Sequence, residues 1–233
     1  MHRSQPTRPH CAVGAGGVRT LRGAFTLVEL LVVLAVIAIL AALSLGGLSK
    51  LGASSDRSQA LSNMRQIGTG ITLFAADNDG KLPGPLWPGQ MAQFDPTRSG
   101  RLVRELAPYL GIPTPAAPRV EPLFVPPAYR KTVSTSFLDS ARTFVVNMSV
   151  RDADHTLVPW GNLATSPASQ PLKLAAIPAQ AWGCSDADAL HPHVVGKSWA
   201  ANTPPKPVHT PKRLAWFFNG SVAPVDDTAL ALP

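Results

Sequence analysis

The sequence predicts an α+β fold in which one long N-terminal helix packs on a small antiparallel sheet with proline-rich loops. Three observations predict it: an uncharged apolar run near the N-terminus, an amphipathic helical pattern that continues it, and the distribution of prolines. Of the 24 prolines, 22 lie beyond residue 80. Such a density favours short strands and turns over a helical bundle. The 233 residues suffice for one domain plus a membrane segment.

The first 24 residues are basic. They contain four arginines and no acidic residue, whereas the rest of the chain has 17 basic against 14 acidic side chains. Most of the formal net charge of +7 therefore reflects this short segment. Because no basic stripe with interleaved aromatic residues follows, we expect no nucleic-acid partner. The four arginines are Arg3, Arg8, Arg19 and Arg22.

An apolar run of 19 residues without a charge extends from Leu30 to Leu48. As a helix it would be roughly 28 Å long, close to the thickness of the hydrocarbon core of a bilayer. It is longer than the apolar core of a cleavable secretory signal, so we expect it to be retained as a transmembrane helix. The basic residues that precede it place the N-terminus in the cytoplasm and the residues beyond about 50 outside it.

Glu29 is the only charged residue between Arg22 and Lys50, and it directly precedes the apolar run. A carboxylate at this depth is costly unless it stays at the interface or finds a cationic partner. Two interpretations are open on physical grounds. Glu29 either sits at the interface, favoured by the dipole of the helix N-terminus, or forms an ion pair.

The helical pattern continues beyond the apolar run, because Leu61, Met64, Ile67 and Ile71 repeat at intervals of three and four residues. We therefore expect one helix from about residue 25 to residue 76. The predicted domains are a leader at 1–24, a transmembrane helix at 25–50, an amphipathic helix and turn at 51–80, and a globular extracytoplasmic domain at 81–233.

Three further elements are predicted in the globular domain. A short helix is expected at 102–110, where apolar residues share one face and Gly111 follows. Residues 143–150 have the composition of a strand. Residues 214–218 and 221–225 flank Asn219-Gly220, a dipeptide that predicts a hairpin with a type I′ turn.

The segment GAFTLVEL, from Gly23 to Leu30, resembles the processing motif of type IV prepilins. The resemblance implies that a prepilin peptidase/methyltransferase cleaves the leader on the cytoplasmic face and methylates the new N-terminus. Glu29 matches the glutamate at mature position five if the cut falls between Ala24 and Phe25. A cut after Gly23 would move Glu29 to position six and remains the alternative.

In that family the glutamate is thought to pair with the terminal amine of a neighbouring subunit. The resemblance therefore assigns processing to Gly23, Ala24 and Phe25, and assembly and register to Phe25 and Glu29. It implies a structural pseudopilin subunit of a type II secretion or type IV pilus-like filament, not an enzyme. The implied partners are the peptidase, other pseudopilins and a secretion platform protein, with the chain crossing the bacterial inner membrane once and its C-terminal domain in the periplasm.

The wider layout resembles the pseudopilin-like proteins of planctomycete and verrucomicrobial bacteria. The similar features are the DNDGKLP turn after the long helix, the acidic SDAD segment at 185–188, and Pro207-Val208-His209 before the closing hairpin. The alternative function is a membrane-anchored extracytoplasmic binding or sensing module that uses the prepilin signal only for placement.

Acidic and histidine side chains raise the question of a metal. Asp77 and Asp79 lie in a sequence that fits either a calcium turn or a helix stop, and Asp186 and Asp188 are further calcium candidates. A hydrolase would need Asp186, Asp188 and the nearby histidines to converge, yet His-Pro-His matches no zinc spacing. We expect no cofactor, with calcium left open. The histidines are His191, His193 and His209.

Cys184 is the only cysteine left once a leader containing Cys11 is removed. No intramolecular disulfide is then possible, so we expect Cys184 to be a small packed residue.

Overall fold

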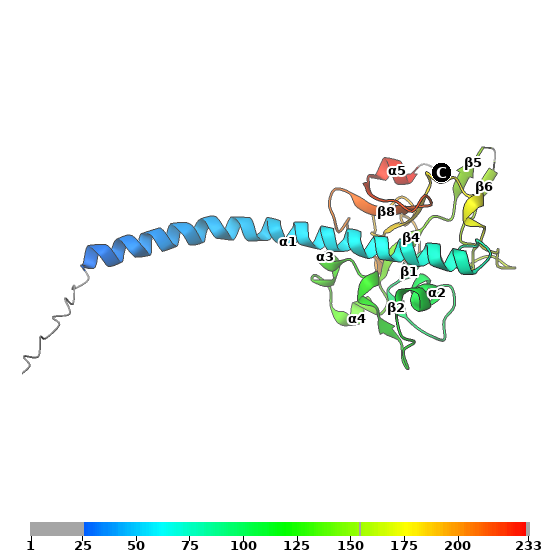
Figure 1. Cartoon of the computed structure of the whole chain (residues 1–233), viewed down its shortest axis with the longest axis horizontal. Coiled ribbons are helices and arrows are strands. Elements are labelled where there is room, and N and C mark those ends of the chain that lie inside the picture. Colours follow the sequence, from blue (N-terminus) through cyan, green and yellow to red (C-terminus); the bar gives the residue numbers. More distant parts are fainter. Residues whose placement is uncertain (1–25, 154, 232–233) are drawn as a thin grey trace, which may run out of the picture. The chain divides into compact units, whose positions relative to one another are not determined.

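The structure is a computed structural model that describes residues 26–153 and 155–231, with the side chains of 43–51 outside the described part. The predicted leader and the processing residues Gly23, Ala24 and Phe25 lie outside the described residues. The chain divides into two compact units, residues 1–48 and residues 49–233. Figure 1 shows the elements of both units in chain order.

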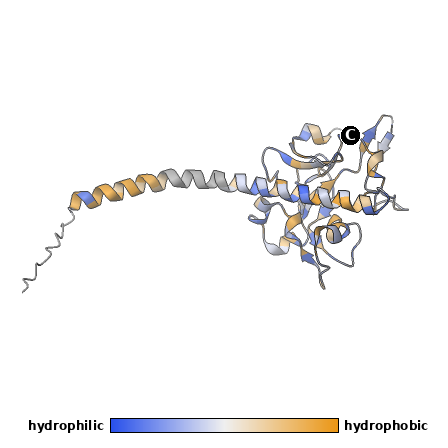
Figure 2. Cartoon of the chain, in the orientation of Figure 1, coloured by the Kyte–Doolittle hydropathy of each residue, from blue (hydrophilic) through white to orange (hydrophobic). Residues whose placement is uncertain are grey.

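Helix α1 extends from Leu27 to Asp77 and contains 51 residues. The predicted long helix is therefore confirmed to within two residues at each end. In its first turns the described side chains are almost uniformly hydrophobic, whereas hydrophobic and hydrophilic residues alternate from residue 52 onward (Figure 2). Among the described residues, no helix combines the length and apolar character that a membrane crossing requires.

The acidic turn after α1 is a helix stop. Asp79 and Gly80 both have positive φ, at 54° and 78°, and the N–H of Gly80 donates to the carbonyl of Ala75 at 2.8 Å. The side-chain amide of Asn78 donates to the carbonyl of Phe74 at 2.8 Å. These bonds occupy carbonyls that the end of a helix leaves free, which explains the Asp, Asn and Gly of this turn.

The predicted small antiparallel sheet is confirmed. Five strands pair in the order β1-β4-β7-β8-β9, each antiparallel to its neighbour. Two further ribbons pair β2 with β3 and β5 with β6. The strands are β1 (Gly89–Met91), β2 (Gln93–Phe94), β3 (Arg119–Val120), β4 (Arg142–Val146), β5 (Val150–Asp152), β6 (His155–Leu157), β7 (Trp182–Asp186), β8 (Arg213–Phe217) and β9 (Val222–Val225).

The predicted short helix is present as α2 (Leu102–Leu106) followed by the 3-10 turn η1 (Ala107–Leu110). It ends at Gly111, which has a φ of 64°. The other short helices are η2 (Pro122–Phe124), α3 (Pro127–Arg130), α4 (Thr135–Leu138), η3 (Leu174–Ala176), η4 (Ala200–Asn202) and α5 (Asp227–Ala231).

The predicted strand at 143–150 is two strands. β4 ends at Val146, and β5 begins at Val150. Asn147 makes the break, because its side chain donates to the carbonyl of Trp182 at 3.0 Å and accepts from the N–H of Ser149 at 3.0 Å. An asparagine that bonds its own backbone two residues on forms a turn instead of continuing a ladder.

The closing hairpin is confirmed, but its predicted type I′ turn is wrong. That turn needs positive φ at both central residues, and of Asn219 and Gly220 only Gly220 has it, at 85°. The N–H of Gly220 donates to Phe217, and the N–H of Phe217 donates to the carbonyl of Ser221. The connection is therefore a longer loop with glycine in the left-handed region.

The core lies on both faces of the sheet. One face of the second half of α1, with Met64, Ile67 and Ile71 buried, packs in the same cluster as Leu214 and Trp216 of β8. Because side chains of a strand alternate between faces, Ala215 belongs to the opposite cluster. That second cluster contains Leu230 of α5, so the sheet of residues 49–233 is covered on both sides.

Candidate functional site

Thr26 caps the start of α1. The N–H of Glu29 donates to both the carbonyl and the hydroxyl oxygen of Thr26, at 3.1 Å and 3.2 Å. The Thr26 hydroxyl in turn faces Glu29 Oε2 at 3.5 Å. This Thr-x-x-Glu pattern is a capping-box arrangement, which places one acidic residue in the first turn. The Thr-x-x-Glu spacing is visible in the sequence, but Thr26 is not among the predicted site residues.

The Glu29 carboxylate is exposed and forms no ion pair with any described residue. The dipole of the helix N-terminus favours a negative charge here, in line with one of the two interpretations of Glu29. Because the carboxylate is exposed, it can accept a cationic group in addition to the Thr26 hydroxyl.

The turns that follow Glu29 expose apolar side chains on every face of the helix. The large hydrophobic residues from 27 to 40 are between 45% and 80% exposed. A helix that is hydrophobic all round is stable only in an apolar environment, either lipid or other helices. The exposed residues are Leu27, Val28, Leu30, Leu31, Val32, Val33, Leu34, Val36, Ile37, Ile39 and Leu40.

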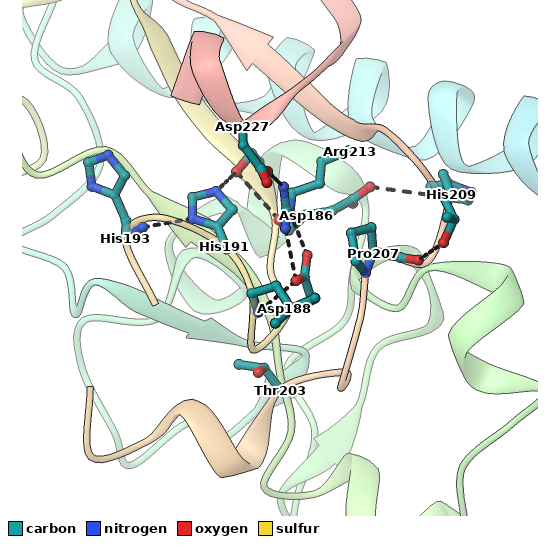
Figure 3. A network of polar contacts seen from close by, with 12 residues as sticks. Asp186, Asp188, His191, His193, Thr203, Pro207, His209, Arg213 and Asp227 are labelled. Atoms are coloured by element: carbon teal, nitrogen blue, oxygen red, sulfur yellow. Dashed lines mark hydrogen bonds and ion pairs between the residues drawn. The ribbon is translucent and has the colours of Figure 1, made fainter. Parts of the chain in front are cut away.

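A second group of polar side chains lies at the end of β7, within the unit 49–233 (Figure 3). Arg213 binds both carboxylate oxygens of Asp188, at 2.5 Å and 2.9 Å, and also contacts Asp227 of α5. The side chains of Arg213 and Asp188 are each 1% exposed. The calcium candidate Asp188 is therefore the partner of a buried bidentate ion pair that joins the segment after β7 to β8, and Arg213 extends the contact to α5.

Asp186 is buried beside that ion pair. Its Oδ2 accepts the N–H of Leu214 at 3.1 Å and also lies 3.9 Å from Nε2 of His209 (Figure 3). Burial raises the pKa of Asp186 to about 7, and the charge of Asp188 adds to this, against the lowering by Leu214 and Arg213. Asp186 is thus a carboxyl group that titrates near neutral pH.

His191 is held in one tautomer. Nδ1 accepts the N–H of His193 at 3.0 Å, so the ring proton is on Nε2, which lies 2.9 Å from the hydroxyl of Ser185. Burial lowers the pKa of His191 to about 3, with further lowering by Arg213 and His193. His193 donates from Nε2 to the carbonyl of Leu230 at 3.0 Å. His191 therefore bonds to β7 and His193 bonds to α5, and burial also lowers the pKa of His193.

The three candidate histidines contact different partners. His191 and His193 face Ser185 and Leu230, and of the three histidines only His209 lies near Asp186. Within residues 26–153 and 155–231, no group of three or more His, Cys, Asp or Glu side chains could hold a metal ion. Calcium binding at Asp77, Asp79, Asp186 or Asp188 stays a prediction.

Cys184 is fully buried in β7 and carries a free thiol. Burial raises the pKa of this thiol well above its usual value, so it remains protonated. The prediction of a small packed cysteine is confirmed.

Residues 19–45 match the family model of the prokaryotic N-terminal methylation motif. The match includes GAFTLVEL and the capped start of α1, so it confirms the predicted prepilin-type signal. It indicates a precursor of the type IV pilin-like or pseudopilin kind, and it implies processing by a prepilin peptidase and assembly with other pilins. The resemblance to planctomycete and verrucomicrobial proteins stays a prediction. Comparisons with curated proteins and with solved structures gave no match.

Proposed function

We propose that the protein is a structural pseudopilin subunit of a type II secretion or type IV pilus-like filament. One observation carries the proposal: the methylation motif coincides with the capped start of a helix whose apolar side chains are exposed all round. A filament subunit needs such a helix twice, first against lipid and then against the helices of its neighbours. Its role is assembly, not catalysis.

Processing by the prepilin peptidase falls between Ala24 and Phe25 in this proposal. The cut removes the basic leader and creates an amine at Phe25, four residues before Glu29. Thr26 begins the helix directly after the new terminus. The new amine and the Glu29 carboxylate are therefore close together in the sequence, both before the apolar run.

Charge pairing between neighbouring subunits sets the register. An amine and a carboxylate at the edge of an apolar phase are each costly alone, and each offsets the other when two copies pack together. Glu29 lacks an ion-pair partner within the described chain, as this role requires.

The apolar residues Leu30–Leu48 anchor the subunit in the bacterial inner membrane as a single pass, with the N-terminus in the cytoplasm and the C-terminal domain in the periplasm. The basic residues before this run and its length support that orientation. A secretion platform protein then moves subunits from the membrane into the filament.

Crosslinking between copies in cells tests the proposal. A photo-crosslinking side chain at Leu31 should join neighbouring subunits in the wild-type background. Glu29→Gln should leave leader removal intact and reduce these crosslinks about tenfold. Glu105→Gln removes the same charge from a half-buried position in α2, so its crosslinks should match the wild type.

Undiminished crosslinking of Glu29→Gln would overturn the pairing step. A processed wild-type protein without crosslinks between copies would favour the alternative, a solitary membrane-anchored binding or sensing module.

A further inference from the structure

A cavity of about 470 Å³ in the unit 49–233 brings three arginines and two tryptophans together. We call it the arginine–tryptophan pocket, formed by Trp87, Arg98, Arg101, Arg142 and Trp199 around Gly89. These residues come from β1 and the segment before it, the loop before α2, β4 and the segment before η4. The volume is in the range of pockets that hold small ligands.

Gly89 of β1 forms the floor of the pocket. A Cβ atom at this position would lie 2.6 Å from Cδ of Arg142 and 2.9 Å from ring atoms of Trp199. Only glycine allows both side chains to approach the strand so closely. The guanidinium of Arg142 lies over the indole of Trp199, 5.3 Å from the ring centroid, in a cation–π contact.

Trp87 forms an exposed and well-supported wall. It is 45% exposed, an unusual position for so large an apolar ring. The backbone N–H of Trp87 donates to the carbonyl of Gly100 at 3.1 Å. A Cβ on Gly100 would lie 2.9 Å from the indole ring of Trp87. Trp87 makes no ring contact with another aromatic side chain of the described residues, and its exposed part lines the pocket.

The pocket carries an excess of positive charge. Arg98 pairs with Asp95 at 3.2 Å, and Arg101 donates to the carbonyl and side-chain oxygens of Gln93 at 3.0 Å and 3.1 Å. Arg142 forms no ion pair with any carboxylate of the described chain. Burial lowers the pKa of both Arg101 and Arg142, which reflects the cost of holding these charges away from water.

We propose that the arginine–tryptophan pocket binds an oxyanion carried on a ring that can stack on an indole. The anion would lie against Arg142 and Arg101, because a guanidinium fork matches the geometry of carboxylate and phosphate groups. The ring would stack on the exposed indole of Trp87. An acidic sugar and a nucleotide share this chemistry. The site goes beyond the filament role and does not depend on it.

Calorimetric titration of the full chain in detergent tests the proposal with four probes: digalacturonate, adenosine 5′-monophosphate, a neutral galactose disaccharide and inorganic phosphate. At least one of the two ring-borne anions should bind ten times more tightly than both the neutral sugar and phosphate. If digalacturonate binds, the ligand class is an acidic sugar. If adenosine 5′-monophosphate binds, the ligand class is a nucleotide. Binding of neither, or binding no tighter than phosphate, would overturn the proposal.

Three variants locate the binding. Arg142→Gln should weaken it about tenfold or more, because a charge-assisted pair is lost. Arg151→Gln removes the same charge from an exposed position of β5 and should change nothing. Trp87→Ala, on the exposed wall, should weaken binding without changing the thermal midpoint of unfolding. If Arg142→Gln unfolds the domain, Trp87→Ala tests whether the ligand binds in the arginine–tryptophan pocket. Equal losses in the Arg142 and Arg151 variants would contradict the site.

Discussion

A Cβ atom on Gly68 of α1 would come closer than 3.0 Å to Cδ1 and Nε1 of Trp216 in β8. The indole of Trp216 is 1% exposed and also contacts Trp160 and Phe218, so it has little room to move. Helix α1 can pack this closely against Trp216 because residue 68 lacks a side chain. A glycine inside a helix costs about 1 kcal/mol relative to alanine, and the close packing of Trp216 offsets that cost.

Gly68→Ala should therefore destabilise the domain, although alanine is the better helix former. We expect a loss of about 1–3 kcal/mol in the free energy of unfolding, from overpacking against Trp216. Urea unfolding of the full chain in detergent, followed by tryptophan fluorescence, measures it. Gly52→Ala is the matched control, because a Cβ there meets nothing within 4 Å. It should be neutral or up to about 1 kcal/mol more stable. Equal stability of the two variants would contradict the packing argument.

Removing only one partner of the buried ion pair between Arg213 and Asp188 should destabilise the fold. Arg213→Leu leaves the Asp188 carboxylate buried without its partner, so we expect a loss of about 3–5 kcal/mol in the same unfolding experiment. The double variant Arg213→Leu/Asp188→Leu should regain most of that loss, because the buried carboxylate is gone and Asp227, the other partner of Arg213, is 66% exposed. A double variant as unstable as the single one would show that the pair is not the source of the effect.

An exposed ion pair serves as the control for that experiment. Lys131 and Asp56 are joined at 2.6 Å, but the lysine side chain is 63% exposed. Lys131→Gln should cost no more than about 1 kcal/mol, because water screens the pair.

Asp186 should make the stability of the protein depend on pH. Its folded pKa of about 7 lies above the usual value of 3.8, so the folded state holds a proton that the unfolded state releases between these pH values. The contribution of Asp186 to the free energy of unfolding is therefore greatest below about pH 4. It falls as the pH rises to about 7, by at most about 1.4 kcal/mol per pH unit.

Comparison with Asp186→Asn isolates that contribution. The asparagine oxygen can still accept the N–H of Leu214, but the side chain does not titrate. The stability of the variant relative to wild type should rise between pH 4 and pH 7. His191 acts in the opposite direction, since its lowered pKa stabilises the folded state as pH rises through its range, and it is present in both proteins. Parallel stability curves would contradict the assignment to Asp186.

The elements that the sequence predicted well are those set by local chemistry. Helix α1 follows from its apolar pattern and its Asp-Asn-Asp-Gly stop, and the short helix at 102–110 ends at a left-handed Gly111 as expected. The hairpin position follows from Asn219-Gly220. Its turn type does not, because the conformation of Asn219 depends on which strand residues pair.

The details of the polar sites depend on contacts between distant residues. Asp186 and Asp188 resembled metal ligands because nothing near them in sequence shows that Arg213, 25 residues beyond Asp188, completes the ion pair. The arginine–tryptophan pocket is hidden for the same reason. Trp87 and Trp199 are separated by more than a hundred residues, and only the pairing of β1 with β4 brings Arg142 beside them.

Mass spectrometry of the N-terminus of the protein isolated from its own membrane fraction tests the central claim most directly. We expect a chain that begins at Phe25 with a methylated amine and retains the apolar residues that follow. A chain that still begins at Met1, or one that begins beyond residue 48, would contradict it.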